Sequence, residues 1–573
     1  MLCIWGAAIW EADGRVHSRA NWGFRMSYFL STAVPRRTSL STCLAVVLGS
    51  AAIFATSGDA FATWQHKHDF KHRTREQALA LTGARPHANA RANFDHQAFH
   101  AHLRAKFGAH KAAVPNRPAA NVAVTSCADD GSAGTLRYAV ANAASGDTID
   151  LSGLACSTIT LTTGAIATGL DDLTISGPGA ANLTIDAAGN DRALVHYGSG
   201  TFTIDKVTVA NGNFDYYQYS GGGCILALGS ALNINNSVVT GCQASTAYYE
   251  YGYAIAEGGA IYSNGTTALT NSTVSNSATY AYGRYGGAVS VGGGLYSKGL
   301  ATLTNSTITG GGVYGYKYYT DYNSFMRGGG FYGRGGVSIT GSTIDNNYAY
   351  FGGAGIGSVD GPTTISNSTV ADNYSFLGYG GGIFTLFGPA TISNSTISGN
   401  YSFASAGGLY TVYSPLDLQS TLIASNTSSQ GSATADFSYY GGAAYTPTGA
   451  NNLIVTSAYA VPAGTLNTDP NLQALANNGG PTRTMALITG SSAIDKGNNA
   501  AGLATDQRGT GFARVGGTFA DIGAFELQVA APTAEKIPAP ALSTWAELLL
   551  AGAMGLLGLG GFLRRKRLSS ESS

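Results

Sequence analysis

Charged residues are scarce in this 573-residue chain: Asp, Glu, Lys and Arg together make up 11% of it, under half the usual share. The 32 basic and 32 acidic side chains balance, so the formal net charge is zero. This composition excludes a coiled coil, a highly charged solvating chain and an ordinary helical enzyme. Proline is rare, at 15 residues. The sequence has no Gly-X-Y period, which excludes collagen. The chain is instead rich in Gly (79) and Tyr (32), with much Ser, Thr and Asn, which predicts an all-β protein of stacked strands and turns.

Long apolar runs are also rare, and the one near the start resembles a targeting segment. Arg36 and Arg37 precede an apolar run over 44–55, and the small-x-small triplet 60–62 follows it. A charged region, an apolar region and such a triplet predict a secretory signal. We therefore expect a signal region over 1–62, with translation starting at Met26, cleavage after Ala62 by signal peptidase, and an exported mature chain; a non-cleaved anchor is the alternative.

The other apolar run, 548–563, has 16 residues and is followed by four basic residues. Together with the preceding 540–545 segment, it resembles the IPTL-CTERM sorting signal, although Ala539 and Ala541 depart from that motif. The resemblance implies processing by an exosortase-like membrane protease at the envelope of a Gram-negative bacterium, with a transient or permanent C-terminal membrane anchor. A plain membrane anchor is the alternative. The matching residues are Pro540, Leu542, Ser543, Trp545, Arg564, Arg565, Lys566 and Arg567.

Residues 63–120 differ in composition from the rest of the chain. They hold ten Lys and Arg against three acidic residues, and eight of the ten histidines. No Cys or carboxylate framework accompanies the histidines, so we expect no metal site there or elsewhere, and no cofactor. We interpret this segment as a basic, disordered spacer. Residues 121–531 have 12 basic and 23 acidic residues and no basic stripe, which argues against nucleic-acid binding.

Seven repeats of one short phrase decide the fold prediction. Each has Asn, Gly or Gln, then Ser, then β-branched or apolar residues, and successive copies are 35, 34, 36, 26, 27 and 25 residues apart. A second phrase, glycines followed by an apolar and often an aromatic residue, recurs in step with it. Two phrases at one period indicate one structural coil per repeat. The copies of the first phrase begin at Asn236, Asn271, Asn305, Gly341, Asn367, Asn394 and Gln419.

These repeats predict a parallel β-helix over 121–466. Apolar and small polar residues alternate within each phrase, so one set of side chains faces a shared core. Glycine permits the tight bends, and Asn at equivalent positions of successive coils can form a hydrogen-bonded ladder. We expect about eleven coils spaced by the usual distance between strands, ~4.8 Å.

Two further segments resemble known families. The segment from Cys127 to Cys156 resembles the opening coil of secreted right-handed β-helix proteins, a single-stranded, pectate-lyase-like solenoid. Residues 467–530 resemble the choice-of-anchor Q domain, and 531–573 would be the linker and sorting helix. The resemblance implies a surface or extracellular β-helix and implies no reaction. The Q-like matches are Asp469-Pro470, Ser491 to Gly497, Asp506-Gln507-Arg508-Gly509 and Asp521 to Glu526.

The four cysteines of the mature chain are Cys127, Cys156, Cys224 and Cys242, which allow three pairings. Proximity in sequence favours Cys127–Cys156 and Cys224–Cys242. Export would permit both disulfides to form.

Evidence for catalysis is weak, so we expect a non-enzymatic protein, with a polysaccharide lyase or glycoside hydrolase as the alternative. A glycosidase needs two convergent carboxylates, whereas the adjacent Asp171 and Asp172 should point to opposite faces of a strand. A lyase needs cations near its substrate, and Arg284, Arg327 and Arg334 are the best candidates.

Tyrosine is the most informative residue: 20 of the 32 lie between 212 and 350, where the coils are longest. We expect the extra residues to form adjacent loops on one edge, which either bind a surface polysaccharide or protein ligand, or pack on each other. We therefore predict an adhesive, carbohydrate-binding or structural protein. The candidate ligand-binding residues are Tyr248, Tyr249, Tyr251, Tyr253, Tyr280, Tyr282, Arg284, Tyr285, Tyr314, Tyr316, Tyr318 and Tyr319.

Overall fold

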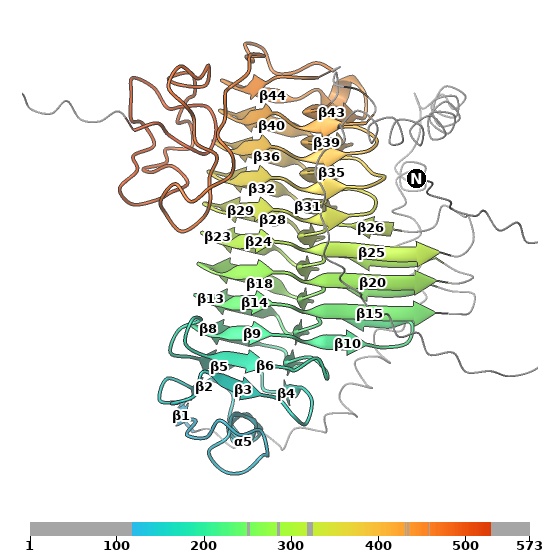
Figure 1. The fold of residues 1–573 in the computed structure, drawn as a ribbon, viewed down its shortest axis with the longest axis vertical. Helices are drawn as coiled ribbons and strands as arrows, with labels where there is room; N and C mark the ends of the chain where they lie inside the picture. Colours follow the sequence, from blue (N-terminus) through green and yellow to red (C-terminus); the bar gives the residue numbers. More distant parts are fainter. Residues whose placement is uncertain are drawn as a thin grey trace, which may run out of the picture. The chain divides into compact units, whose positions relative to one another are not determined.

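The computed structural model describes residues 117–528 except 249–252, 284–286, 318–324, 430, 432–434 and 458. The predicted signal region, most of the spacer and the sorting segment lie outside these residues. The described chain forms five sheets of 12, 11, 10, 8 and 4 strands, in which all strands of a sheet run parallel (Figure 1). This confirms the prediction of an all-β, right-handed, single-stranded parallel β-helix of about eleven coils.

Ten coils contribute one strand to each of the three core sheets; eight of these also contribute to the eight-stranded sheet, and four to the four-stranded sheet. The 12-stranded sheet contains β1 (Asn121–Ala123), β2 (Asp147–Asp150), β5 (Leu173–Ser176), β8 (Thr201–Asp205), β13 (Ala231–Asn235), β18 (Thr266–Thr270), β23 (Ala301–Thr304), β28 (Val337–Thr340), β32 (Thr363–Ser366), β36 (Ala390–Ser393), β40 (Leu416–Gln419) and β44 (Thr448–Ala450).

The next strand of each coil joins the 11-stranded sheet. It contains β3 (Thr158–Thr160), β6 (Thr184–Asp186), β9 (Thr208–Ala210), β14 (Val238–Thr240), β19 (Thr273–Ser275), β24 (Thr307–Thr309), β29 (Thr343–Asp345), β33 (Thr369–Ala371), β37 (Thr396–Ser398), β41 (Leu422–Ala424) and β45 (Leu453–Ile454).

The chain then passes through the eight-stranded sheet before it closes the coil through the ten-stranded sheet. The eight-stranded sheet contains β10 (Asn213–Asp215), β15 (Gln243–Tyr248), β20 (Ala278–Gly283), β25 (Gly312–Lys317), β30 (Tyr348–Ala349), β34 (Tyr374–Ser375), β38 (Tyr401–Ser402) and β42 (Thr427–Ser428). The ten-stranded sheet contains β4 (Ile166–Thr168), β7 (Leu194–His196), β12 (Ile225–Ala227), β17 (Ile261–Ser263), β22 (Leu295–Ser297), β27 (Phe331–Gly333), β31 (Ile356–Val359), β35 (Ile383–Leu386), β39 (Leu409–Val412) and β43 (Phe437–Tyr440).

The Tyr-rich inserts were expected to be loops, and in their described parts this is wrong. They lengthen β15, β20 and β25 to 6 residues each. The chain returns through a four-stranded sheet of β11 (Tyr219–Gly221), β16 (Ala254–Glu257), β21 (Ala288–Val291) and β26 (Phe325–Arg327). The inserts continue the strand pairing because their alternating small and aromatic residues suit a pleated strand. They are adjacent, as predicted, since β15, β20 and β25 pair in register.

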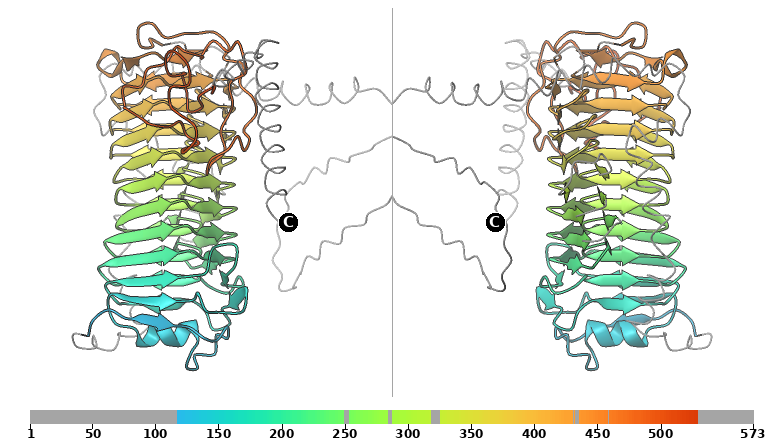
Figure 2. Two further views of the ribbon diagram at one scale, coloured as in Figure 1. Left: turned by 90° about the vertical axis from the view of Figure 1, so that its left-hand side faces the viewer. Right: turned by 90° about the vertical axis from the view of Figure 1, so that its right-hand side faces the viewer.

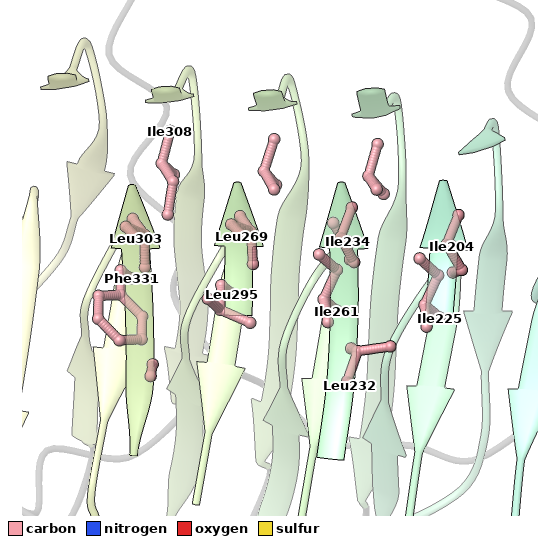
Figure 3. Packing of buried hydrophobic residues seen from close by; sticks show 14 of the residues in the cluster. Ile204, Ile225, Leu232, Ile234, Ile261, Leu269, Leu295, Leu303, Ile308 and Phe331 are labelled. Atoms are coloured by element: carbon pink, nitrogen blue, oxygen red, sulfur yellow. The ribbon is translucent and has the colours of Figure 1, made fainter. Parts of the chain in front are cut away.

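The interior of each coil is a single apolar core. Alternating residues of the core sheets point inward, as in β13, where Leu232 and Ile234 are buried and their neighbours are partly exposed. Figure 3 shows Ile234 and Leu269 of the 12-stranded sheet opposite Ile261 and Leu295 of the ten-stranded sheet. Stacked identical positions therefore bury the apolar face of each coil against its neighbours.

Hydrogen-bonded ladders form at two bends, as predicted for asparagine at equivalent positions of successive coils. In the repeated phrase, Asn236 and Asn271 adopt left-handed backbone with φ of 48° and 49°, and the side-chain amide of Asn271 donates to Oδ1 of Asn236 at 3.3 Å. The Ser that follows also forms a ladder, because the amide of Ser272 donates to Oγ of Ser306 at 3.1 Å. An asparagine ladder exists at another bend, through Asn347, Asn373, Asn400 and Asn426.

The helical structure lies at the two ends of the described solenoid: α5 (Leu136–Asn142) at the start and the 3₁₀-helix η2 (Ala443–Tyr445) near the end. Both predicted disulfides are present: Cys127–Cys156 closes the first coil beside α5, and Cys224–Cys242 joins two bends within one coil. Two disulfides indicate an oxidising compartment. No helix within the described ranges is long and apolar enough to cross a membrane.

Residues 467–528 fold back along the outward side of the 11-stranded sheet (Figures 1 and 2). Gln507 links the two parts: its amide donates to Oγ1 of Thr343 at 2.9 Å, and its carbonyl accepts from Thr369 at 2.6 Å. The amide of Ala524 donates to Oγ1 of Thr396 at 3.0 Å. This segment therefore covers the later coils on one side.

The motif residues of this segment hold it together. Arg508 pairs with Asp506 at 2.6 Å and lies between the rings of Phe512 and Phe525, at 3.9 and 3.8 Å from their centroids. Arg514 and Glu526 form a second buried pair at 3.0 Å. These buried, paired charges have a structural role, because removing either partner would leave a buried charge without its counterion.

Candidate functional site

Five tyrosines stack in a row on the outward side of the eight-stranded sheet, and we call them the tyrosine ladder: Tyr280, Tyr314, Tyr348, Tyr374 and Tyr401. Successive ring centroids are 5.0, 5.0, 6.0 and 4.5 Å apart, and the ring planes differ by at most 16°. Residues between them, such as Ala281, Val313 and Ser375, point inward and are buried. The ladder exists because parallel in-register strands place equivalent side chains above one another.

The ladder changes register once, at Gly312. Tyr280 is paired with Tyr314, but Tyr348 is paired with Gly312 rather than with Tyr314. The ring of Tyr314 leans over Gly312, where a Cβ atom would lie 2.3 Å from a ring carbon. The missing side chain of Gly312 thus leaves room for the Tyr314 ring to stack on Tyr348. Glycine is needed here for close approach and not for its backbone conformation.

The ladder is open to solvent. Tyr280, Tyr314 and Tyr374 are 41, 38 and 41% exposed, and Tyr348 and Tyr401 are half-buried. Ring faces inside the ladder are covered by neighbouring rings, so the exposed parts are ring edges and hydroxyl groups. Partial burial, followed by neighbouring phenols, raises the pKa values of Tyr314, Tyr348 and Tyr374 above 10. The hydroxyls therefore stay protonated and able to donate at neutral pH.

A second aromatic row lies beside the ladder, two residues further along three successive coils. It consists of Tyr350, Phe376 and Phe403, and we call it the outer row. Phe376 and Phe403 are 41 and 38% exposed. Tyr350 and Phe376 are tilted by 52° at 5.4 Å, so their faces are not covered as in the ladder. Tyr350 also packs edge to face on Phe351 at 4.9 Å, so Phe376 and Phe403 are the exposed rings of the outer row.

Among the described side chains, no outward position of this face is charged from β15 to β38. The described outward positions are occupied by Gln243, Ser245, Ala247, Ala278, Tyr280, Tyr282, Gly312, Tyr314, Tyr348, Tyr350, Tyr374, Phe376, Tyr401 and Phe403. A ligand of the ladder and the outer row, which together we call the aromatic face, therefore meets rings and hydroxyls but no fixed charge.

Of the twelve predicted ligand-binding residues, the structure places Tyr280 and Tyr314 in the ladder. Tyr282 is half-buried on β20, and Tyr253 is half-buried just before β16. Tyr249, Tyr251, Arg284, Tyr285, Tyr318 and Tyr319 lie outside the described residues, as do the side chains of Tyr248 and Tyr316. Sequence reasoning missed Tyr348, Tyr374, Tyr401 and the outer row.

A second tyrosine stack lies inside the protein, between the ten-stranded and four-stranded sheets. We call Tyr262, Tyr296 and Tyr332 the buried stack; their centroids are 5.1 and 5.9 Å apart. Their exposed fractions are 3, 0 and 1%. Nearby, the Tyr219 hydroxyl donates to the buried carboxylate of Glu257 at 3.0 Å. This stack is part of the packing that holds the two sheets together.

Arg327 and Arg334, the described arginines that were candidates for lyase chemistry, are each held by contacts with other side chains. Arg327 is 5% exposed, and its guanidinium lies over Phe325 and Phe384, at 4.7 and 4.1 Å from the centroids. Burial lowers its pKa to about 10, so it remains charged at neutral pH. Arg334 pairs with Asp360 at 3.1 Å. A lyase is therefore not favoured.

The two adjacent aspartates near the start of the helix also serve the fold. Asp171 accepts hydrogen bonds from the amide and hydroxyl of Ser199, at 3.0 and 2.6 Å, which lower its pKa. Asp172 accepts from the amide of Thr201 at 2.8 Å. Both carboxylates thus fasten one coil to the next. Within the described residues, no cluster of three His, Cys, Asp or Glu side chains could hold a metal ion.

Comparisons with known proteins add little to this description. No family model matches the chain. No curated protein matches its sequence. Among solved structures, the chain is similar to one described as "Crystal structure of pectate lyase Pel9A", with 14% sequence identity and a TM-score of 0.33 over 72% of this chain and 97% of that chain.

Proposed function

We propose that this chain is an exported, envelope-associated β-helix protein that binds a neutral surface polysaccharide on its aromatic face. The observation that supports this most is the combination of exposed rings and hydroxyls with the lack of charge at the described outward positions of this face. Sugars present apolar C–H faces and many hydroxyls, which match exposed aromatic faces and phenol groups. An acidic polysaccharide would call for Lys or Arg at these positions.

The two aromatic rows would have different tasks. The faces of Phe376 and Phe403 would stack on sugar rings, while the ladder hydroxyls would hydrogen-bond with sugar hydroxyls. The hydroxyls of Tyr280, Tyr314 and Tyr348 have no hydrogen-bond partner within the described protein, so they are available to a ligand or to water. Both rows cross successive coils, so an extended polymer lying along the helix axis could contact several coils at once.

The route to the envelope is part of the same proposal. The secretory signal over 1–62 would direct export, and signal peptidase would release the chain after Ala62. The IPTL-CTERM-like segment would then be processed by an exosortase-like protease, and the basic spacer of 63–120 would separate the β-helix from its surroundings. The two disulfides support the export step because they require an oxidising compartment.

Retention and cleavage should be measured together on a panel of neutral and acidic polysaccharides. We expect wild-type protein to be retarded in gels that contain a neutral polysaccharide, and the Phe376→Ala, Phe403→Ala double variant to bind a few-fold to about tenfold more weakly for each lost ring. Phe519→Ala is the matched control, because Phe519 is 60% exposed in the C-terminal segment.

Three outcomes would contradict the proposal. Equal retention of the double variant and the Phe519→Ala control would remove the aromatic face from binding. Retention by acidic polysaccharides alone would contradict the neutral ligand. New reducing ends or unsaturated uronates would favour the alternative, a lyase or hydrolase on the same scaffold.

A further inference from the structure

In the described part of the chain, tyrosine is the most easily oxidised residue type that is exposed, and the tyrosine ladder places five tyrosines side by side. The four cysteines there are locked in two disulfides. None of the five tryptophans lies between 117 and 528. The two methionines in that range, Met326 and Met485, are 2 and 8% exposed. One-electron oxidants that reach this surface will therefore react mainly with exposed tyrosines.

Some exposed tyrosines outside the ladder contact another ring, as Tyr216 contacts Phe214 and Tyr459 contacts Tyr439, but Tyr138 is isolated within the described residues. Tyr138 on α5 is 43% exposed, close to the 41% of Tyr280 and Tyr374, and no aromatic ring stacks on it. In the ladder, each ring lies 4.5 to 6.0 Å from the next, with nearly parallel planes. A radical formed on one ladder ring can pass to its neighbours, so a ladder radical is spread over several exposed positions.

We propose that the tyrosine ladder is a site of oxidative cross-linking between two copies of this chain. The oxidant is hydrogen peroxide used by a haem peroxidase. Each of two tyrosines loses one electron and the proton of its hydroxyl, which reduces one peroxide to two waters. The two phenoxyl radicals join through ring carbons next to their oxygens, and the ring hydrogens at those carbons move to the oxygens. The product is one dityrosine with both hydroxyls restored.

The geometry favours a link between molecules over a link within one ladder. The new bond joins the edges of two rings, beside the hydroxyls. Within the ladder the rings meet face to face, with ring planes only 8 to 16° apart, so their edges do not point at each other. The edges that are exposed point to solvent, where the ladder of a second copy can reach them. The uncharged face also presents no repulsion between two copies.

Peroxide and peroxidase treatment of a mixture of unlabelled and ¹⁵N-labelled full-length chain tests this directly. We expect dityrosine fluorescence, a dimer that survives boiling in detergent, and linked peptides that combine one labelled and one unlabelled partner. Those peptides should contain Tyr280, Tyr314, Tyr348, Tyr374 or Tyr401, and Tyr138 should be rare among them.

Two variants test whether cross-linking depends on the ladder or only on the exposure of a tyrosine. Changing all five ladder tyrosines to Phe keeps the stacked rings and removes the phenols, so we expect the amount of dimer to fall severalfold. Tyr138→Phe should leave the dimer unchanged. Three results would each overturn the proposal. The number of links at each tyrosine could follow only its exposed fraction, the links could all lie within one chain, or the five-fold variant could form as much dimer as the wild type.

Discussion

The protein contains two tyrosine stacks built by the same repeat geometry, one buried and one exposed. Tyr262, Tyr296 and Tyr332 are at most 3% exposed, whereas Tyr280, Tyr314 and Tyr374 are 38 to 41% exposed. In both, strand pairing sets the ring spacing near 5 Å. The difference lies in what covers them: the buried stack packs into the apolar cluster between the ten-stranded and four-stranded sheets, and the ladder faces solvent. Stacking alone is therefore no sign of function, and exposure distinguishes rings that only pack from rings that a ligand can reach.

The largest expected effect is on stability. Tyr296→Ala removes a fully buried ring with a neighbour on each side, so we expect it to lower the free energy of unfolding by ~3–5 kcal/mol. Tyr314→Ala removes two exposed ring contacts and should cost about 1–2 kcal/mol. Denaturant unfolding of both variants measures the difference, and equal losses would contradict the distinction between the stacks.

A smaller effect is expected at the register change of the ladder. Gly312→Ala places a methyl group where the Tyr314 ring lies, so that ring must move away from Tyr348. We expect a stability loss of about 1 kcal/mol, because the exposed ring can rotate, together with weaker polysaccharide retention. Gly153→Ala serves as the control, because a Cβ atom there would have no heavy atom within 4 Å. Normal retention by Gly312→Ala would show that ladder continuity is unimportant.

The smallest effect is the pH dependence of the phenols. The pKa values of Tyr314, Tyr348 and Tyr374 are raised above 10 in the folded protein, and burial raises that of Tyr410 much further. Above pH 10 the folded chain thus holds more protons than the unfolded chain, so the free energy of unfolding falls as the pH rises. An alkaline absorbance titration should show the ladder phenols ionising before Tyr410, and ionisation of Tyr410 first would contradict the burial difference.

The repeat spacing predicted the fold because the solenoid depends on residues that recur at one position of every coil. The disulfide pairing was also predictable, since each pair joins cysteines that are close in sequence. Whether a given tyrosine is buried or exposed was not predictable, because the inserts form their own sheet and cover part of the surface. The number of tyrosines per region also favoured the inserts as the binding site over the shorter coils.

One sequence signal could have revealed the aromatic face. Three short coils contain the same pattern of Asn, Tyr, a small residue and an aromatic residue, at Asn347 to Tyr350, Asn373 to Phe376 and Asn400 to Phe403. In a strand, this pattern places the small residue inward and both aromatic rings outward. The Asn of the pattern forms the internal ladder, so one phrase encodes both the structural and the exposed rows.

The central claim is that a neutral polysaccharide binds the aromatic face. Hydroxyl-radical footprinting of the chain, with and without the polysaccharide that retains it most strongly, tests this residue by residue. We expect slower oxidation of Phe376, Phe403 and Tyr374 in the complex, with Tyr138 and Phe519 unchanged. Protection of Tyr138 or Phe519 with no change at the aromatic face, or no retention by any neutral polysaccharide, would contradict it.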